Sequence, residues 1–559
     1  MSIVKTLEAM CRDCYRCVRA CPVKAIGIKN NQAFINQDRC INCGTCVKTC
    51  LQKAKVDISQ LDDIKKIVKS GDVVACVAPS FAAEYPGYLR RRLVAGLRGL
   101  GFKRVEETSI GADAVASYTK KLVMATGRGG ISTACPAVVD YVQTYMPEHI
   151  DLLLPIVSPM IAHAKITKAL HPDMRAVFIG PCVAKKAEAQ QEKYKGIVDG
   201  VLTFRELNGW FAEEGIVLDE CCDSGFDQIG HLDTAKLFPL PGGMIKTAGL
   251  DGSIDSINIV HTSGPENTIT LLKAAVDSND LEVIEPLFCE GGCIGGAGND
   301  NTNNIFEKRN DIIEYAHEKE PVFGVEEKMP TVDLSTSFVK KPFPTVKYTE
   351  QDILDVYEHT YKSAPENRLN CGACGYNSCE ENAIAILNGM AEYSMCIPYM
   401  RRRAENRADT ILEHAPEGVV ILDEALTIQS LNPAFEKYFS CSSSIIGRKI
   451  SYLLESTLYE RVLAQPAKYL ESIIEYMGKE FHQVVFYLPM EKHYVGIYMD
   501  LSNIKLNEAK IQSSRDKTIR RVEKLIAQNL EMAQKMADYL GESAARSETL
   551  LEELTQSDD

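Results

Sequence analysis

The sequence predicts a multidomain chain in which α/β and α+β folds are joined to small metal-binding segments. Its 559 residues exceed the usual size of one domain and allow roughly three to five. Its 20 cysteines lie mostly in tight, repeated spacings. Short apolar runs at 72–78 and 175–180, separated by helical patterns within 71–320, indicate buried parallel strands. These features together predict several folded parts that share a metal or redox chemistry.

The composition limits the expected partners and compartment. A net charge of −14 argues against nucleic acid or an anionic membrane surface as the main partner. No apolar run reaches the roughly 20 residues that a membrane span needs. The start of the chain is too short and too charged for a signal-peptide core. We therefore expect a cytoplasmic protein, in which clustered thiols bind metal rather than form disulfides.

Residues 1–57 carry two copies of one cysteine spacing. The first copy is Cys11-x2-Cys14-x2-Cys17-x3-Cys21, and the second is Cys40-x2-Cys43-x2-Cys46-x3-Cys50. Three close thiolates can hold three irons of a cubane while the fourth ligand comes from the other copy. We therefore expect one [4Fe–4S] cluster on Cys11, Cys14, Cys17 and Cys50, and a second on Cys40, Cys43, Cys46 and Cys21. Zinc is the alternative, disfavoured by the doubled repeat and by Pro22. The segment resembles a bacterial two-cluster ferredoxin, which implies an electron wire.

Four further cysteines lie far apart within residues 71–320. Cys135 stands in Ser-Thr-Ala-Cys-Pro, and Cys182 stands in Gly-Pro-Cys-Val-Ala-Lys-Lys-Ala-Glu. Cys289 and Cys293 share the block Cys-Glu-Gly-Gly-Cys-Ile-Gly-Gly, whose glycines let the backbone approach a bulky cofactor. In this order, the three blocks resemble the three signature motifs of [FeFe]-hydrogenases. With the N-terminal segment, the resemblance extends over residues 1–320.

This resemblance implies that residues 71–320 form an H-cluster domain. The H-cluster is a [4Fe–4S] cubane bridged to a di-iron centre that carries CO, cyanide and a dithiolate amine. The four cysteines would hold the cubane, with Cys293 as the bridge. Lys185 would bind a cyanide ligand, as suits a fixed ammonium beside a hydrogen-bond acceptor. The other implied site positions are Ala78, Pro79 and Ser80 in one loop, Ser158 and Met160 in another, and the structural acid Glu188.

Some positions depart from the family pattern. The family usually has a cysteine directly before the first ligand that passes protons to the bridging amine, and here that position is Ala134. Two methionines that usually pack against the di-iron centre correspond to Gly180 and Leu287. Because proton relay by a positioned group typically contributes about 10²–10⁴-fold, we expect slow turnover. Glu290 offers a substitute proton route, although a solvated or structural carboxylate is an equally good interpretation.

A third iron–sulfur segment is expected in residues 347–400. It follows residues 321–346, where four prolines and little periodicity predict an extended linker. The spacing Cys371-x2-Cys374-x4-Cys379-x16-Cys396 resembles a small [4Fe–4S] domain of corrinoid and electron-transfer proteins. Zinc is again the alternative. The position of the segment in the chain suggests a redox relay toward the C-terminal half.

Residues 409–505 resemble a PAS domain in the segments Ile411–Asp423 and Ile428–Phe435. The implied fold is a five-stranded antiparallel sheet with helices on one face, and strands are expected at 418–423, 481–488 and 494–500. We find no haem or flavin attachment motif. The apolar positions of 510–556 follow a heptad-like spacing, which predicts a coiled-coil-like signalling helix and a homodimer. No kinase or phosphatase motif follows, so the output would lie on another chain or in the dimer geometry.

The whole layout resembles the sensory [FeFe]-hydrogenases. It implies slow, reversible H2 oxidation and proton reduction, with a signal that passes through iron–sulfur clusters to the PAS domain and the terminal helix. The alternatives are a metabolic, ferredoxin-linked hydrogenase and a Narf-like protein that binds a cubane without the di-iron centre. The expected partners are H2, protons, a redox protein such as ferredoxin, the H-cluster maturation proteins, and a signalling kinase or phosphatase on another chain. Neither nucleic acid nor a membrane span is expected.

Overall fold

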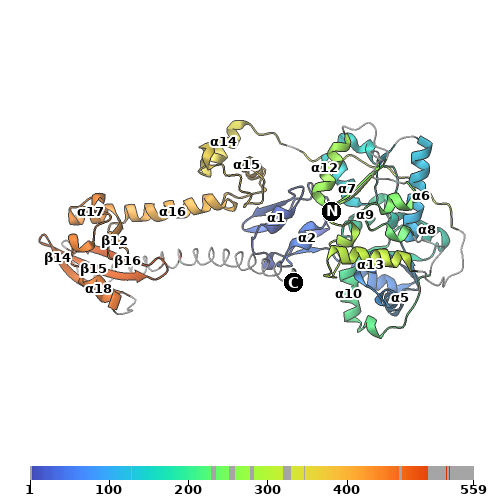
Figure 1. Cartoon of the computed structure of the whole chain (residues 1–559), viewed down its shortest axis with the longest axis horizontal. Coiled ribbons are helices and arrows are strands. Elements are labelled where there is room, and N and C mark those ends of the chain that lie inside the picture. Colours follow the sequence, from blue (N-terminus) through green and yellow to red (C-terminus); the bar gives the residue numbers. More distant parts are fainter. Residues whose placement is uncertain are drawn as a thin grey trace, which may run out of the picture. The chain divides into compact units, whose positions relative to one another are not determined.

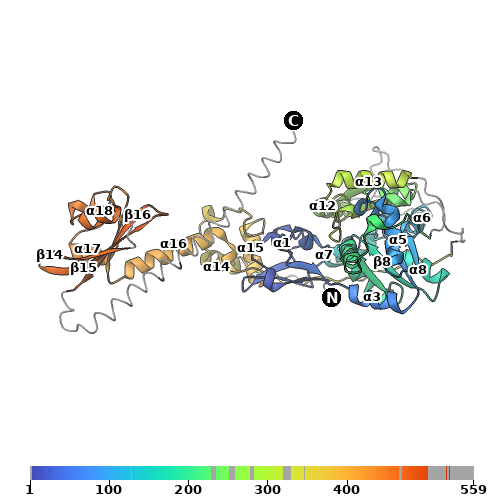
Figure 2. The same cartoon turned by 90° about the horizontal axis from the view of Figure 1, so that it is seen from below.

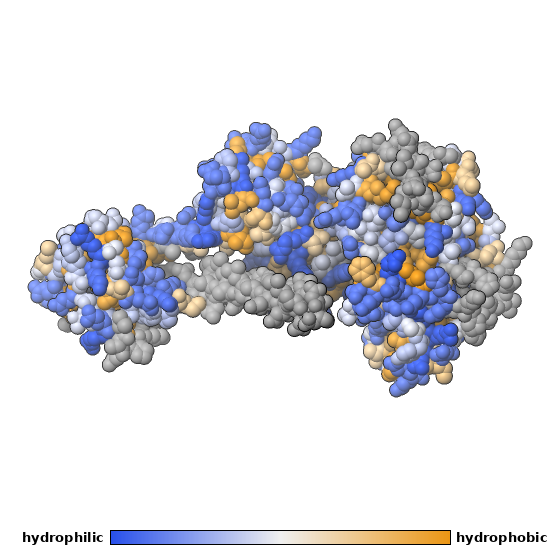
Figure 3. Space-filling model, viewed as in Figure 1, coloured by the Kyte–Doolittle hydropathy of each residue, from blue (hydrophilic) through white to orange (hydrophobic). Residues whose placement is uncertain are grey.

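The computed structural model forms two compact units, residues 1–400 and 401–559 (Figure 1). It describes residues 3–126, 129–227, 234–250, 259–276, 283–318, 329–344, 346–464 and 469–501, with the single residues 524 and 528. Within these residues, no helix is both long and apolar enough to cross a membrane. Hydrophilic and hydrophobic residues are interspersed on the face shown in Figure 3. The signalling helix expected at 510–556 lies outside the described residues apart from 524 and 528, as do residues 321–328 and 345 of the expected linker.

The N-terminal part has the internal repeat that its sequence predicts. Each cysteine run contains a short helix, which is α1 (Arg16–Ala20), labelled in Figure 2, or α2 (Thr45–Thr49), labelled in Figure 1. Cysteines of both runs pack in one buried cluster. The strands form two antiparallel pairs, β1 (Val4–Thr6) with β4 (Lys55–Asp57), and β2 (Ile26–Lys29) with β3 (Gln32–Ile35). Because the first and last strands pair, the segment closes on itself as a ferredoxin-like fold.

Two parallel sheets form the core of the next domain. The order in the larger sheet is β6 (Arg104–Glu107), β5 (Val73–Val77), β8 (Arg175–Gly180) and β9 (Gly200–Thr203). The smaller sheet contains β10 (Ile259–Ser263), β11 (Val283–Leu287) and β7 (Gly130–Ile131). All five residues of β5 are buried, as expected for a parallel strand that is covered on both faces. The strands expected at 72–78 and 175–180 are thus the neighbours β5 and β8.

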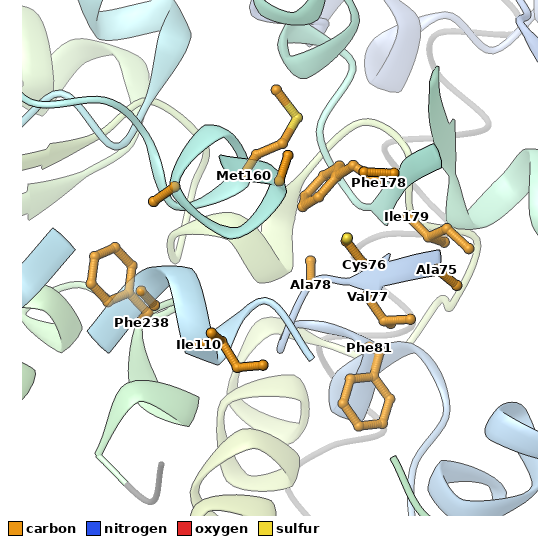
Figure 4. Close-up of a cluster of buried hydrophobic side chains, with 14 of the residues drawn as sticks. Ala75, Cys76, Val77, Ala78, Phe81, Ile110, Met160, Phe178, Ile179 and Phe238 are labelled. Carbon is orange, nitrogen blue, oxygen red and sulfur yellow. The ribbon is translucent and has the colours of Figure 1, made fainter. Parts of the chain in front are cut away.

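Helices pack on these sheets and enclose the main hydrophobic core. Figure 4 shows part of that core, where side chains of β5 and β8 pack with Phe81 and Ile110 from two of the helices. The resulting fold is the α/β core that the sequence predicts. Its helices are α3 (Leu61–Ser70), α4 (Phe81–Glu84), α5 (Leu89–Gly99), α6 (Ser109–Thr126), α7 (Pro136–Tyr145), α8 (Pro159–Leu170), α9 (Ala184–Ala189), α10 (Phe204–Glu213), α11 (Gly243–Thr247), α12 (Pro265–Val276) and α13 (Ile305–His317).

Residues 347–400 form a small helical part that packs on the ferredoxin-like segment. Lys24 Nζ donates to Gly375 O at 2.8 Å, and the Ile28 N–H donates to Met390 O, with a nitrogen–oxygen distance of 3.0 Å. The third cysteine set therefore lies against the segment that carries the first two. The helices of this part are α14 (Glu350–His359), α15 (Cys379–Leu387) and the beginning of α16 (Ile397–His414).

The second unit contains the five-stranded antiparallel sheet that a PAS domain predicts. Side chains fill its interior, where the hydroxyls of Tyr459 and Tyr498 are 2.8 Å apart and Gln483 Nε2 donates to Tyr498 at 2.9 Å. The strands expected at 418–423, 481–488 and 494–500 are β12, β15 and β16. The elements in sheet order are β13 (Ile428–Leu431), β12 (Gly418–Leu422), β16 (His493–Asp500), β15 (Lys479–Leu488) and β14 (Leu470–Tyr476), with the helices α17 (Pro433–Phe439) and α18 (Thr457–Ala464).

One buried cation joins the ferredoxin-like segment to the α/β domain. Lys186 on α9 is 1% exposed. Its ammonium donates to carboxylates of Asp57 on β4 and Glu206 on α10, and to Ile58 O at 3.0 Å. Three acceptors therefore satisfy the three donors of the ammonium, and the buried charge is fully paired.

Removal of this cation should destabilise the first unit. Lys186→Met leaves two carboxylates without their buried counterion, so we expect the free energy of unfolding to fall by about 3–5 kcal/mol. Guanidinium unfolding of the anaerobically purified protein measures this loss. Lys195→Met is the control, because the pair of Lys195 with Glu192 is exposed and such pairs contribute little. Equal stability of the two variants would contradict the role given to Lys186.

Candidate functional site

A cavity lies at the carboxyl ends of β5 and β8. Parallel strands place these ends at one edge of a sheet, where open α/β folds bind their ligands. Among the expected site residues, the cavity is lined by Ala78, Pro79, Ser80, Ala134, Met160, Lys185, Cys182 and Cys293. Its other lining residues are Thr108, Ala112, Pro159, Phe178, Pro181, Phe238, Pro239 and Leu287. Figure 4 shows Ala78, Met160, Phe178 and Phe238 among the surrounding side chains.

Two hydrogen-bond donors at the cavity wall are available to a ligand. Lys185 Nζ donates to Glu188 Oε2 at 2.7 Å and to Ala134 O at 3.2 Å. An ammonium has three N–H donors, so one is left for the cavity. Ser80 is 2% exposed, and its Oγ has no hydrogen-bond partner within the described part of the chain. Small acceptors such as cyanide fit these two unused donors.

The four widely spaced cysteines come together beside the cavity. Burial and the neighbouring Cys135 thiol raise the pKa of Cys182 to about 11, against the opposing effect of Lys185. Burial also raises the pKa of Cys289 and of Cys293, and the thiols of Cys182 and Cys135 add to both shifts. Thiolates crowded in a buried space repel one another, and cationic irons relieve that repulsion. The donor set therefore fits an iron–sulfur cubane.

Close backbone packing requires a glycine beside Cys293. Gly292 has a φ of 88°, and a Cβ there would lie 2.3 Å from Pro239 O. The Cys293 N–H donates to the same carbonyl, with a nitrogen–oxygen distance of 2.8 Å. The glycine therefore lets the backbone of Cys293 bind the cavity wall at Pro239.

The N-terminal thiols group as the two expected quartets. Cys17 has the neighbours Cys11, Cys14 and Cys50, and Cys46 has the neighbours Cys21, Cys40 and Cys43. Burial is the main reason that the pKa of each of these two central thiols is raised. Each quartet thus draws its fourth thiol from the other cysteine run. The assignment of these thiols as cluster ligands stays a prediction, and this grouping supports it.

Gly44 brings the ferredoxin-like segment against the central thiols. It has a φ of 76°, and a Cβ there would lie 2.4 Å from Val183 Cγ2 and 2.8 Å from Ala297 Cβ. The adjacent Cys43 thiol is among the groups that raise the pKa of Cys289. The quartet that contains Cys43 therefore adjoins the four central thiols.

The third cysteine set also comes together. One small cavity is lined by Cys371, Cys374, Cys379 and Cys396. Tyr376 lies between this set and the N-terminal segment, because burial and the thiols of both Cys374 and Cys21 raise the pKa of its phenol. This set therefore adjoins the N-terminal quartets.

Besides Cys135 and Cys289, three expected residues of the central site do not line the cavity. Ser158 is buried at the start of α8, where its Oγ accepts from the Ile161 N–H at 3.5 Å. Glu188 accepts a hydrogen bond from the Lys185 ammonium and so helps to orient it, as expected for a structural acid. Glu290 is exposed, and its carboxylate lies beside Gly264. The structure therefore does not bring Glu290 to the cavity, as the substitute proton route would require.

Sequence reasoning missed several lining residues. Thr108 and Phe178 lie at or near strand ends, and no motif marks them. Phe238 and Pro239 belong to the run Phe-Pro-Leu-Pro-Gly-Gly at 238–243. Its density of proline and glycine is a signal of a structured loop that could have marked it.

Comparison with known families gives matches to four parts of the chain. Residues 71–297 match the family described as iron only hydrogenase large subunit, C-terminal domain. Residues 3–51 match a 4Fe-4S dicluster domain, residues 367–398 match an Fe-S cluster family, and residues 406–472 match a PAS domain.

Similar proteins share the hydrogenase description. The NADP-reducing hydrogenase subunit HndD of Solidesulfovibrio fructosivorans is 24% identical over 425 residues, which are 61% of this chain and 72% of that protein. Iron hydrogenase 1 of Clostridium pasteurianum is 24% identical over 373 residues, which are 52% of this chain and 64% of that protein. A solved structure of a variant of [FeFe]-hydrogenase HydA1 from Chlamydomonas reinhardtii covers 51% of this chain and 100% of its own, with 18% identity and a TM-score of 0.40. The chain therefore contains an iron-only hydrogenase large subunit domain, together with iron–sulfur domains and a PAS domain.

Proposed function

We propose that this chain is a sensory [FeFe]-hydrogenase, which equilibrates slowly with H2 at an H-cluster and passes the redox change through iron–sulfur clusters to its PAS domain. One observation carries the proposal. The cavity beside Cys293 presents two unused donors, Lys185 and Ser80, which match the acceptor ligands of a di-iron centre. A cubane alone would need neither donor.

The residues of the chain would hold and orient the cofactor. When bound, the H-cluster supplies the splitting and formation of H2. The four central cysteines would hold its cubane, while Lys185 and Ser80 orient small acceptors on the di-iron side. Phe178, Phe238 and Leu287 are buried in the cavity wall and exclude water.

Ala134 supports slow turnover. Its side chain lines the cavity but cannot carry a proton, and its carbonyl accepts from Lys185. Glu290 is exposed and does not line the cavity. A missing relay typically costs about 10²–10⁴-fold in rate. A slow site suits a sensor, which needs to equilibrate with H2, better than it suits a metabolic enzyme.

The order of the thiol sets supports a path for electrons. The central thiols adjoin the quartet of Cys43, and Tyr376 has thiols of both the N-terminal segment and the third set as neighbours. Cys396 directly precedes α16, which leads in sequence to the PAS domain. We assign the third set as the exit toward the PAS domain. A separate redox protein, such as a ferredoxin, would exchange electrons with the same N-terminal segment.

Infrared spectroscopy of the matured protein tests the di-iron centre. We expect Fe–CO and Fe–CN stretching bands that shift between H2 and an inert gas, because H2 changes the redox state of the centre. Lys185→Met should shift the Fe–CN bands more than the Fe–CO bands, since it removes a donor to cyanide. A matured protein without such bands would contradict the proposal and favour a Narf-like cubane protein.

Truncation between the two units tests the sensory assignment. A chain that ends at Met400 keeps all the thiol sets, so we expect its H2 oxidation rate with a redox dye to equal that of the full chain. In the full chain, H2 should change the protease cleavage pattern of residues 401–559. Turnover as fast as that of a metabolic enzyme, or a cleavage pattern that ignores H2, would contradict the sensory role.

Removal of a thiol from the third set tests the exit path. Cys379→Ala should lower the iron content by about four irons per chain without changing the zinc content. It should also abolish the H2-dependent cleavage pattern while the infrared bands remain. Cys222→Ala is the control, because this exposed thiol belongs to none of the sets. An unchanged iron content in Cys379→Ala would count against a third cluster.

A further inference from the structure

A row of buried polar side chains begins at the cavity wall and ends at the edge of the larger sheet. Thr108, which follows β6, lines the cavity. Its Oγ lies 3.2 Å from Nδ1 of His163 on α8, and Nε2 of His163 lies 3.2 Å from Oε2 of Glu106 on β6. The other carboxylate oxygen of Glu106 accepts from Arg104 Nε at 2.8 Å. The four side chains therefore form a continuous hydrogen-bonded row.

The row leads from the interior to solvent. Thr108 is 2% exposed, and His163 is fully buried. The side chain of Glu106 is 3% exposed, whereas that of Arg104 is 25% exposed. Because β6 is an edge strand of its sheet, the row reaches water beside Arg104.

Close packing of two helices builds this row. A Cβ at Gly111 on α6 would lie 2.2 Å from Pro159 O and 2.7 Å from His163 N on α8. Only glycine lets the two helices approach until His163 reaches Thr108. A buried ion pair is a weak source of stability, because desolvation offsets much of its attraction, and apolar side chains could fill the same space. Stability therefore does not explain the row, and its end at the cavity wall points to a function there.

The groups around His163 favour its protonated form. The groups that face it are the Cys76 thiol on β5, Glu106 on β6 and Thr108, while Thr167 on α8 itself donates to Glu106. Burial lowers the pKa of His163, but Cys76 and Glu106 raise it to about 10. Burial raises the pKa of Glu106, but hydrogen bonds from His163 and Arg104 leave it below its usual value. An imidazole that holds its proton this firmly releases it slowly.

We propose that Thr108, His163 and Glu106 carry protons between the cavity and the solvent beside Arg104. The inference rests on the proposed H2 chemistry and supplies the proton route that Ala134 cannot. In H2 oxidation, a proton released in the cavity binds Thr108 Oγ while the Thr108 hydroxyl proton passes to Nδ1 of His163 in its minor neutral form, which carries its proton on Nε2. The Nε2 proton of His163 then passes to Glu106, which releases it to water, and the imidazole returns from its Nδ1–H to its Nε2–H tautomer before the second proton follows. The two electrons leave through the iron–sulfur clusters, and proton reduction runs the same steps in reverse.

Hydrogen isotope exchange in the matured full-length protein tests this route. HD formation from H2 in D2O needs proton transfer but no external electron acceptor. Thr108→Val removes the hydroxyl and keeps the side-chain shape, and His163→Gln keeps polar groups that do not titrate. We expect each variant to lower the HD formation rate per H-cluster by about tenfold or more. The intensity of the Fe–CO bands measures the H-cluster content of each sample.

Two further variants separate a proton route from a structural role. Thr167→Val removes a different hydroxyl bonded to Glu106 at 3.3 Å, off the route, and should leave the rate unchanged. Ala134→Cys places a thiol at the usual relay position, so it should raise the rate and make a second change, Thr108→Val, nearly harmless. Unchanged exchange in both Thr108→Val and His163→Gln, or an equal loss in Thr167→Val, would overturn the route. A matured wild-type protein with neither exchange nor Fe–CO bands would instead overturn the proposed function.

Discussion

Two adjacent lysines on α9 fix the cavity and the ferredoxin-like segment relative to each other. Lys186 pairs with Asp57 of that segment, while Lys185 pairs with Glu188 and reaches the cavity wall. Both ammonium groups are buried, so neither can leave its partners without exposing an unpaired buried charge. This short helix therefore links the segment that carries Cys43 to the domain that carries Cys289, and in the proposed function electrons would pass between these two thiol sets.

The cavity has mostly apolar walls, and the Lys185 ammonium and the Ser80 hydroxyl are donors at its wall. At position 134, the alanine side chain carries no exchangeable proton, while the backbone carbonyl accepts a hydrogen bond from Lys185. In the proposed function, the groups that hold the cofactor are therefore separate from the side chains that transfer protons. A protein of this fold could keep the groups that hold the cofactor while proton transfer is rerouted or slowed.

Short cysteine spacings predicted that the N-terminal and third thiol sets would group, because the ligands of one cubane are usually cysteines close together in sequence, whereas the central set was predicted from the resemblance of its three blocks to family motifs. Continuous apolar runs predicted β5 and β8, since parallel strands covered on both faces carry mostly apolar side chains. The lining residues Thr108 and Phe178 escaped prediction because only the tertiary fold brings them to the cavity. Glu290 adjoins Cys289 in sequence, but its exposed carboxylate lies beside Gly264 and not among the residues that line the cavity. The contact of His163 with Glu106, 57 residues apart, has no local sequence signal at all.

The N-terminal segment adjoins both the central thiols and the third set, so in the proposed function it would be a branch point and not a one-way conductor. Electrons that arrive there would divide between an outside acceptor and the proposed exit toward the PAS domain. The signal would then depend on how fast the cell drains electrons as well as on how much H2 is present. A receptor of this kind would compare the supply of electrons with the demand for them, and the same concentration of H2 would give a strong response in a reduced cell and a weak one in an oxidised cell.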